Sequence, residues 1–188
     1  MAQRRHHYDA AFESYLRARR LPYVSVDEAR RALLPEGARL RLERPSEGDG
    51  VGIKSFDFIV YGGASNLIVD VKGRKVPGSS RGLSRRLESW VTQEDVASLA
   101  VWEQLFGDQF SACFAFLYWC ESQPPDGLFQ EVYTYRERWY ALRSVRLSDY
   151  AVHMVQRSAR WKTVHLPIEA FAKFSRPFSQ EIPEGTAV

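Results

Sequence analysis

The sequence predicts an α/β protein with a mixed central sheet flanked by helices. Three observations favour this class. Helical periodicity occurs near the start of the chain and again after Thr92, strand-like segments alternate with these helices, and residues 110–120 are apolar nearly throughout. Such an apolar run is typical of a central strand that is covered on both faces. Because helices and strands alternate along the chain, we expect them to pack in one structure.

Length and composition exclude several classes of protein. The chain has 188 residues, of which 45% are hydrophobic and 13% aromatic, so it is long and apolar enough to fold around a core. Its net charge of +3 is too small to show nucleic-acid binding by itself. No apolar run approaches the roughly 18 residues of a membrane helix, and Arg4-Arg5 precede no signal-like segment. We expect a cytoplasmic protein without a membrane partner, with one domain over 1–174 and a tail over 175–188.

The first half of the chain begins with an amphipathic helix over 8–19, since Tyr8, Phe12 and Tyr15 recur at helical spacing. Pro22 ends it, and a short strand over 23–26, a helix capped by Asp27 and a polar loop over 42–52 follow. Strands are predicted over 55–61 and 66–72. The turn-forming residues 62–65 between them predict an antiparallel hairpin.

The second half begins with a flexible segment over 73–90 and a helix from Thr92 to Gly107, in which Thr92 is the expected cap. The apolar strand over 110–120 comes next. Strands over 131–135 and 139–145, a helix over 148–155, a strand over 161–166 and a helix over 167–174 complete the expected order. Cys113 and Cys120 should point to opposite faces of their strand, so we expect reduced, buried thiols.

The hairpin carries the residues that indicate chemistry. With a turn at 62–65, Asp57 comes opposite Asp70, and directly opposed residues have Cβ atoms only ~4.5–5.5 Å apart. Two such carboxylates call for a positive charge between them, and a divalent cation such as Mg²⁺ prefers oxygen ligands. Lys72 lies two residues after Asp70 and so shares its face. The alternative is that these residues form a solvated strand end, with a surface ion pair between Asp70 and Lys72. A one-residue shift of the hairpin would separate the carboxylates.

A one-sided cationic segment follows the hairpin. Between Lys72 and Arg86 there is no acidic residue, and the flexible composition suits a loop that binds a phosphate backbone. Its predicted nucleic-acid contacts are Arg74, Lys75, Arg81, Arg85 and Arg86. The alternative is a basic loop that is merely solvated.

Asp57, a turn and then Asp70-Val71-Lys72 resemble the core motif of the PD-(D/E)XK nuclease superfamily, which includes restriction endonucleases and archaeal Holliday junction resolvases. Glu13 on the first helix and Gln93 on the helix after the hairpin match the superfamily's order of elements. Phe56 replaces a frequent proline. The resemblance covers residues 8–119 and implies a restriction-endonuclease-like core.

The resemblance also implies a function. It implies a Mg²⁺- or Mn²⁺-dependent endonuclease that cuts DNA to leave a 5′-phosphate and a 3′-hydroxyl, in repair, recombination or restriction. Metal ligands would be Asp57, Asp70, the Val71 carbonyl and Glu13. Lys72 would orient or activate the attacking water, and Gln93 would steady Lys72 or a phosphate.

Residues His7 to Glu13 also resemble the signature of the HYExAFE family, with Asp9 in place of its glutamate. This resemblance implies no activity but emphasises Glu13. A different class of function stays open, namely a nuclease-like fold that binds DNA without cutting it. The aromatic residues after Gln130 either belong to the core or form a homodimer interface.

Overall fold

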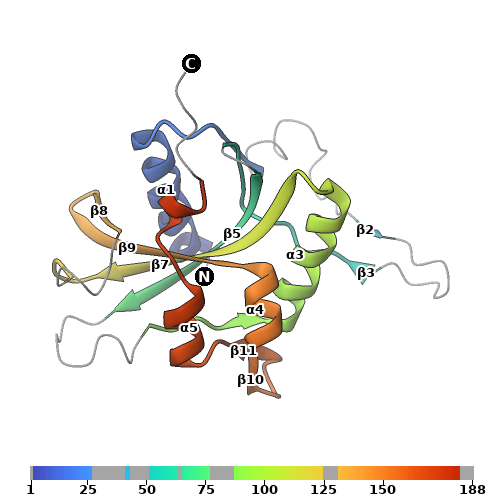
Figure 1. The fold of residues 1–188 in the computed structure, drawn as a ribbon. Coiled ribbons are helices and arrows are strands. Elements are labelled where there is room, and N and C mark those ends of the chain that lie inside the picture. The colour runs from blue at the N-terminus through green and yellow to red at the C-terminus, as the bar shows by residue number, and fades with distance from the viewer. Residues whose placement is uncertain are drawn as a thin grey trace.

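The computed structural model describes residues 2–26, 41–42, 51–62, 65–76, 87–124 and 131–182, and its fold is the predicted mixed α/β architecture (Figure 1). The helix expected after Asp27, most of the loop expected over 42–52 and residues 77–86 of the cationic segment lie outside these residues. Two short paired strands, β2 (Arg41–Leu42) and β3 (Val51–Gly52), flank the undescribed part of that loop.

A six-stranded sheet forms the centre of the molecule, in the order β1-β4-β5-β7-β9-β8. Its strands are β1 (Tyr23–Ser25), β4 (Phe58–Val60), β5 (Asn66–Val76), β7 (Phe110–Cys120), β9 (Arg138–Arg146) and β8 (Val132–Tyr135). Strands β5 and β7 pair in parallel, and the other neighbours in this sheet pair antiparallel. The sheet is mixed because the helix between β5 and β7 carries the chain back to the end at which β5 begins.

Strand β5 is longer than predicted. It continues from Lys72 to Val76, so Arg74 and Lys75 lie on a strand and not in the flexible loop that the sequence suggested. The parallel register runs from Asn66 opposite Phe110 to Val76 opposite Cys120. Because β7 offers a hydrogen-bonding partner along this whole length, pairing outweighs the low strand preference of a central glycine.

Helices cover both faces of the sheet (Figure 1). Helix α1 (Ala2–Ala18) packs on one face, where Phe12 and Leu16 are fully buried against β5 and β7. On the other face lie α3 (Gln93–Phe106), α4 (Leu147–His153) and α5 (Ile168–Phe174). Cys113 and Cys120 are free and buried, and they belong to different sides of the core, as their odd spacing predicts.

A second, smaller sheet has the order β10-β11-β6, with β6 (Val91–Thr92), β11 (Thr163–His165) and β10 (Val155–Ser158). Strand β11 falls within the predicted strand over 161–166. Strand β10 was not predicted, because its residues are largely polar and exposed and carry no apolar alternation. Its pairing with β11 joins the end of α4 to the strand that precedes α3.

Residues 175–182 pack against the large sheet, which corrects the prediction of a loose tail over 175–188. Arg176 forms a β-bridge with Ser144, and a 3-10 helix, η2 (Phe178–Gln180), follows. Phe178 is fully buried and meets the ring of Phe12 with centroids 5.0 Å apart. The few apolar residues in this polar stretch give no periodicity, so the sequence pattern missed them. Residues 183–188 lie outside the described part of the chain.

Two buried glutamates hold the segment 175–182 in place. Glu131 accepts a hydrogen bond from the Phe178 amide at 2.6 Å and another from the Tyr15 hydroxyl, so it links this segment to α1. Glu181 is paired with the Arg146 guanidinium and accepts from the Ser144 hydroxyl at 3.1 Å. Both carboxylates are therefore satisfied where they are buried.

Among the described residues, no helix combines the length and apolar character that crossing a bilayer requires.

Candidate active site

The β4–β5 hairpin has the predicted register. Phe58 lies opposite Val69 and Ile59 opposite Ile68, as the predicted turn requires. The register shifts at Asp57, because its amide donates at 3.0 Å to the carbonyl of Val69, which already faces Phe58. The predicted direct pairing of Asp57 with Asp70 is therefore not formed. The two acids are still close enough for the charge of Asp70 to raise the pKa of Asp57, at the end of the hairpin that is remote from its turn.

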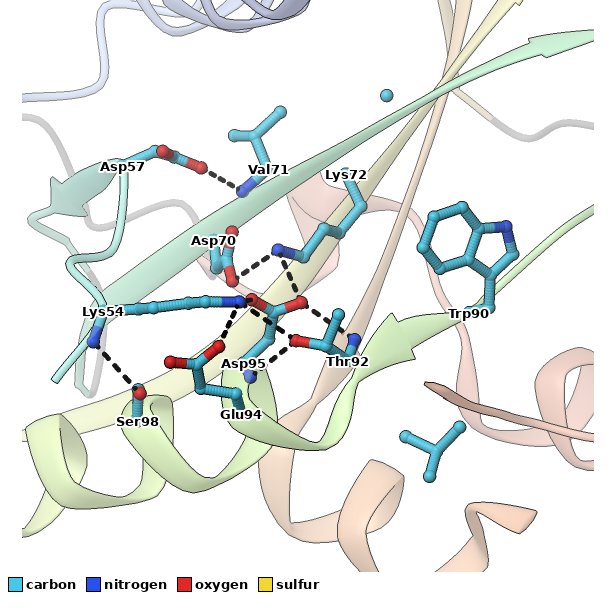
Figure 2. A network of polar contacts seen from close by, with 12 residues as sticks. Lys54, Asp57, Asp70, Val71, Lys72, Trp90, Thr92, Glu94, Asp95 and Ser98 are labelled. Atoms are coloured by element: carbon cyan, nitrogen blue, oxygen red, sulfur yellow. Dashed lines mark hydrogen bonds and ion pairs between the residues drawn. The ribbon is translucent and has the colours of Figure 1, made fainter. Parts of the chain in front are cut away.

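Asp57 occupies the edge of β5 just beyond the end of β4. Its carboxylate accepts a hydrogen bond from the Val71 amide at 2.7 Å (Figure 2). The N–H and C=O of one strand residue point to the same side, so the Val71 carbonyl also faces this open edge. Burial, followed by the charges of Asp70 and Asp9, raises the pKa of Asp57 well above its ordinary value, although the Val71 amide and Lys72 oppose the shift.

Lys72 lies between two carboxylates of different elements. Its Nζ is 2.8 Å from Asp70 on the same strand and 3.3 Å from Asp95 on α3 (Figure 2). All three side chains are about nine-tenths buried. Asp70 and Lys72 thus form a buried ion pair, unlike the solvated surface pair that was the alternative interpretation.

Asp95 is the residue of this network that sequence reasoning missed. It closes the capping box of α3, because its carboxylate accepts from the Thr92 amide at 2.9 Å and its own amide donates to the Thr92 hydroxyl at 3.0 Å. Its other oxygen is 3.0 Å from Lys54 Nζ. Burial by itself would raise the pKa of Asp95, but Lys72, Thr92 and Lys54 together lower it to about 2. The spacing from Thr92 to Asp95 was a signal, but it predicted only a helix cap.

Gln93 lies at the first position of α3 with an exposed side chain, two residues before Asp95. Its backbone amide donates to the Lys162 carbonyl at 2.9 Å and so ties α3 to the turn between β10 and β11. The structure gives Asp95, and not Gln93, a contact with Lys72. The predicted role of Gln93 therefore stays a prediction.

On helix α1 the acid that lines the pocket beside the site is Asp9, whereas the sequence predicted Glu13. Glu13 accepts from the Arg17 guanidinium at 2.6 Å and from the Tyr23 hydroxyl at 2.7 Å, so it faces β1. Asp9, one helical turn earlier, lines a pocket beside the site and raises the pKa of Asp57. Residues four apart share a helix face, so the spacing allowed either acid. The metal-binding role of Glu13 remains a prediction.

An open pocket of about 590 Å³ adjoins this network. Lys72 and Asp95 line it, whereas Asp57 and Asp70 are not among its lining residues and connect to it through Lys72 and Val71. The remaining lining residues come from α1, the segment before β4, β5 and the strand before α3: Tyr8, Asp9, Lys54, Val71, Gly73, Arg74, Trp90, Val91 and Thr92.

Arg74 lies at one side of this pocket. Its guanidinium lies 4.1 Å from the centroid of the Trp90 ring and donates to the carbonyls of Gly73 and Trp90. Burial lowers the pKa of Arg74 below its usual range. Its Nε is buried without a hydrogen-bonding partner in the described part of the chain.

Lys75, a second predicted phosphate contact, is not one of the residues that line the pocket. Lys75 belongs to the neighbouring position of β5, pairs with Glu121 at 2.6 Å and lies 4.9 Å from the centroid of the Trp119 ring. Successive strand residues face opposite sides, so Lys75 and Arg74 serve different surfaces. Arg81, Arg85 and Arg86 lie outside the described residues.

The oxygen atoms at the hairpin edge fit a hard divalent cation. Asp57, Asp70 and the Val71 carbonyl offer oxygen atoms of the kind that such a cation prefers, and burial together with the charges of Asp70 and Asp9 raises the pKa of Asp57. In the described ranges, no group of three or more His, Cys, Asp and Glu side chains is placed to hold a metal ion. A cation here would therefore depend on the backbone carbonyl and on water as well as on the two acids.

Comparisons with known proteins found a similarity in structure but no match to a family or to a curated protein. No known protein family matches the chain, and no curated protein shows a significant match. Among solved structures, the chain is similar to Hjc, a Holliday junction resolvase from the archaeal hyperthermophile Archaeoglobus fulgidus, with a TM-score of 0.50 and 13% sequence identity. The similarity covers 93% of this chain and 97% of that chain. At this identity it shows the fold, which is the restriction-endonuclease-like fold that the sequence predicts.

Proposed function

We propose that this protein is a metal-dependent endonuclease that hydrolyses phosphodiester bonds in DNA. The proposal is supported by the 2.8 Å ion pair between Lys72 and Asp70, by the charge of Asp70 acting on Asp57, and by the adjoining pocket lined by three cations. Paired carboxylates can hold a divalent cation, and an ammonium group can stabilise the charge that develops on a phosphate, which are both contributions to metal-dependent phosphodiester hydrolysis. The fold shared with a Holliday junction resolvase supports the same class of reaction.

Each residue has a role that follows from its position. Asp57, Asp70 and the Val71 carbonyl would hold Mg²⁺ or Mn²⁺, which when bound supplies Lewis-acid stabilisation of the phosphate oxygens. The Lys72 ammonium would orient the attacking water and stabilise negative charge that develops on the phosphate. Asp95 is a positioning residue that holds Lys72 from α3. Asp9 supplies the helix carboxylate nearest to Asp57, a role that Glu13 would take only if it left Arg17 and Tyr23.

The proposed substrate is DNA with a branched or interrupted strand. The name of the similar protein, a Holliday junction resolvase, supports branched DNA, and repair or recombination would be the setting. Arg74 would attract a phosphate of the substrate, because this cation lines the same pocket as Lys72.

The test compares the wild-type protein with Asp70→Ala and Lys72→Ala on branched, nicked and linear DNA in the presence of Mg²⁺ or Mn²⁺. We expect cleavage by the wild type and its loss by at least a hundredfold, of the order removed with one catalytic charge, in both variants. Glu94→Gln is the matched control, since this exposed carboxylate pairs with Lys54 at 2.9 Å in the same network. Unchanged cleavage by Asp70→Ala would exclude this site.

A second candidate is a DNA-binding or assembly module that keeps the fold without cleavage. It is favoured by the engagement of Lys72 with both Asp70 and Asp95, which satisfies the ammonium group without a substrate. The two candidates differ in their response to metal. A nuclease should gain thermal stability on titration with Mg²⁺ or Mn²⁺ through Asp57 and Asp70, and a metal-independent module should bind DNA with no such gain.

A further inference from the structure

We propose that the turn between β10 and β11 is a second nucleic-acid contact, in which Trp161 stacks on an unpaired base next to the pocket. This inference rests on the proposed function, because it assigns the feature of the substrate that such an enzyme would recognise. It concerns the last third of the chain, where the sequence showed no motif that reads bases.

Trp161 differs from the other tryptophans in exposure. Its exposed fraction is 69%, whereas Trp90, Trp102, Trp119 and Trp139 are all partly buried. One exposed apolar side chain is common on protein surfaces, so the groups beside this ring decide what it can bind. The Arg160 guanidinium lies 5.3 Å from the centroid of the Trp161 ring, so the aromatic surface already has a cation beside it.

The charge around Trp161 indicates which class of partner this ring would bind. Between Val155 and Leu166 the sequence contains Arg157, Arg160 and Lys162 and no acidic residue, and of these three cations Arg157 pairs with Glu88 at 3.0 Å. An aromatic ring among cations is the combination with which proteins bind single-stranded nucleic acid, because the ring stacks on a base while the cations attract the phosphates. An interface with a second copy of this chain would bring two such basic turns together, which charge repulsion disfavours.

Hydrogen bonds within the turn hold it in place. The Trp161 amide donates to the Ser158 hydroxyl at 3.3 Å, and the Lys162 amide donates to the Ala159 carbonyl at 3.2 Å. Lys162 adopts a left-handed conformation with φ of 46°, which closes the turn. The tryptophan is thus presented by an ordered turn, and binding would cost little backbone entropy.

The same turn is joined directly to the pocket. Strand β11 places Thr163 opposite Thr92, a pocket-lining residue, and the Lys162 carbonyl accepts from the Gln93 amide at 2.9 Å. On β10, the Arg157 guanidinium lies 5.3 Å from the centroid of the Trp90 ring, which also lines the pocket. A strand whose phosphate lies in the pocket would therefore have neighbouring nucleotides within reach of Trp161.

Stacking on Trp161 requires a base with a free face. In a continuous duplex both faces of each base are already covered by neighbouring base pairs, whereas single strands, branch points and flaps present unstacked bases. Trp161 would therefore favour branched over linear DNA without reading its sequence.

The test measures binding, and not cleavage, by fluorescence anisotropy in EDTA with a branched DNA, a single strand and a linear duplex. We compare the wild type with Trp161→Ala and with Trp161→Phe, which keeps an aromatic face. We expect Trp161→Ala to bind branched and single-stranded DNA about tenfold more weakly, with little change for the duplex and with near wild-type binding by Trp161→Phe. Tyr61→Ala is the matched control, since this residue is 37% exposed at the remote end of β4.

Three results would overturn the inference. Equal binding by Trp161→Ala and the wild type would exclude stacking, and an equal loss on all three DNAs would exclude a preference for unpaired bases. A change from dimer to monomer in Trp161→Ala, measured by light scattering, would assign the ring to contact between copies. If the wild type cleaves DNA and Trp161→Ala binds DNA as tightly as the wild type does, this inference alone is wrong. If the wild type binds none of the three DNAs, the proposed function is wrong as well.

Discussion

At the scale of single residues, the site depends on Asp95, whose two oxygens are divided between Lys54 and Lys72. Neither lysine is held by one acid alone. Lys54 also pairs with Glu94, and Lys72 also pairs with Asp70. The position of Lys72 is thus defined jointly by β5 and α3, so a substitution of Asp95 on the helix should change how Lys72 is held on the strand.

Asp95→Asn should lower the free energy of unfolding by about 2 kcal/mol at pH 7, since its pKa lies near 2 and one pKa unit corresponds to about 1.4 kcal/mol. A lowered pKa gives stability that is present above the ordinary value of 3.8 and lost as the pH falls towards 2. Urea denaturation between pH 2 and pH 7 should show the difference from wild type shrinking below pH 4. Glu94→Gln, an exposed control, should cost at most about 0.5 kcal/mol.

Asp57 should show the opposite dependence on pH. Its pKa is raised by burial and by Asp70, so its contribution to stability is complete below the ordinary value and is lost as the pH rises through the folded-state pKa. Asp57→Asn keeps an acceptor for the Val71 amide but removes the charge. In metal-free buffer, its stability relative to wild type should therefore improve from pH 4 to pH 8. A difference that stays constant over this range would contradict the assigned charge repulsion.

The residues that sequence reasoning found and missed differ in kind. Asp70 and Lys72 lie on one strand, where a period of two puts both side chains on the same face, and the hairpin brings Asp57 to the same end of that strand. Asp9 and Asp95 lie on helices, and their approach to the hairpin depends on how each helix is rotated and docked. That docking is set by packing across the sheet, which the sequence of either helix alone does not reveal.

At the scale of elements, α1 is fitted to β5 through a glycine. A Cβ added at Gly73 would lie 2.1–2.4 Å from three ring atoms of Tyr8, so the ring occupies the space that any side chain there would need. Tyr8 also lines the pocket. The docking of the helix and the shape of the pocket are therefore coupled at this position.

Gly73→Ala should lower the free energy of unfolding by about 1–3 kcal/mol, because the added methyl group overpacks the contact with Tyr8. Adding Tyr8→Ala should recover part of that loss, and a double-mutant cycle in urea measures the coupling. Gly107→Ala is the control. Its Cβ would meet nothing within 4 Å and its φ of 77° makes the cost purely one of backbone strain, so Tyr8→Ala should not relieve it.

Two strands, β5 and β10, differ from what the local sequence pattern predicts. The sequence ended β5 at Lys72 because a glycine and basic residues follow, yet pairing with β7 carries it to Val76. Strand β10 has no apolar alternation and exists through its pairing with β11. In both cases a neighbouring strand, and not intrinsic preference, determines the element.

At the scale of the whole molecule, the segment 175–182 connects parts that are distant in sequence. Phe178 packs against Phe12 of α1, and Glu131 before β8 binds both this segment and Tyr15. The helix that carries Asp9 is therefore held in part by residues near the end of the chain.

Phe178→Ala should lower the free energy of unfolding by about 3–5 kcal/mol, since the side chain is fully buried and its loss leaves a cavity. Chemical denaturation monitored by circular dichroism measures this change. Ser179→Ala, next in the same 3-10 helix, should stay within about 0.5 kcal/mol of wild type. Similar stability of the two variants would mean that this segment does not support α1.

The hairpin turn lies at the far end of β4 from Asp57, with Gly62 and Ser65 on either side of it. The chain can therefore be opened or lengthened there without interrupting the β4–β5 pairing that lies next to both acids. A circularly permuted protein with its new ends at this turn, or one that carries a fluorescent reporter inserted there, should retain the site. That position gives experimenters access to the protein without altering the pocket.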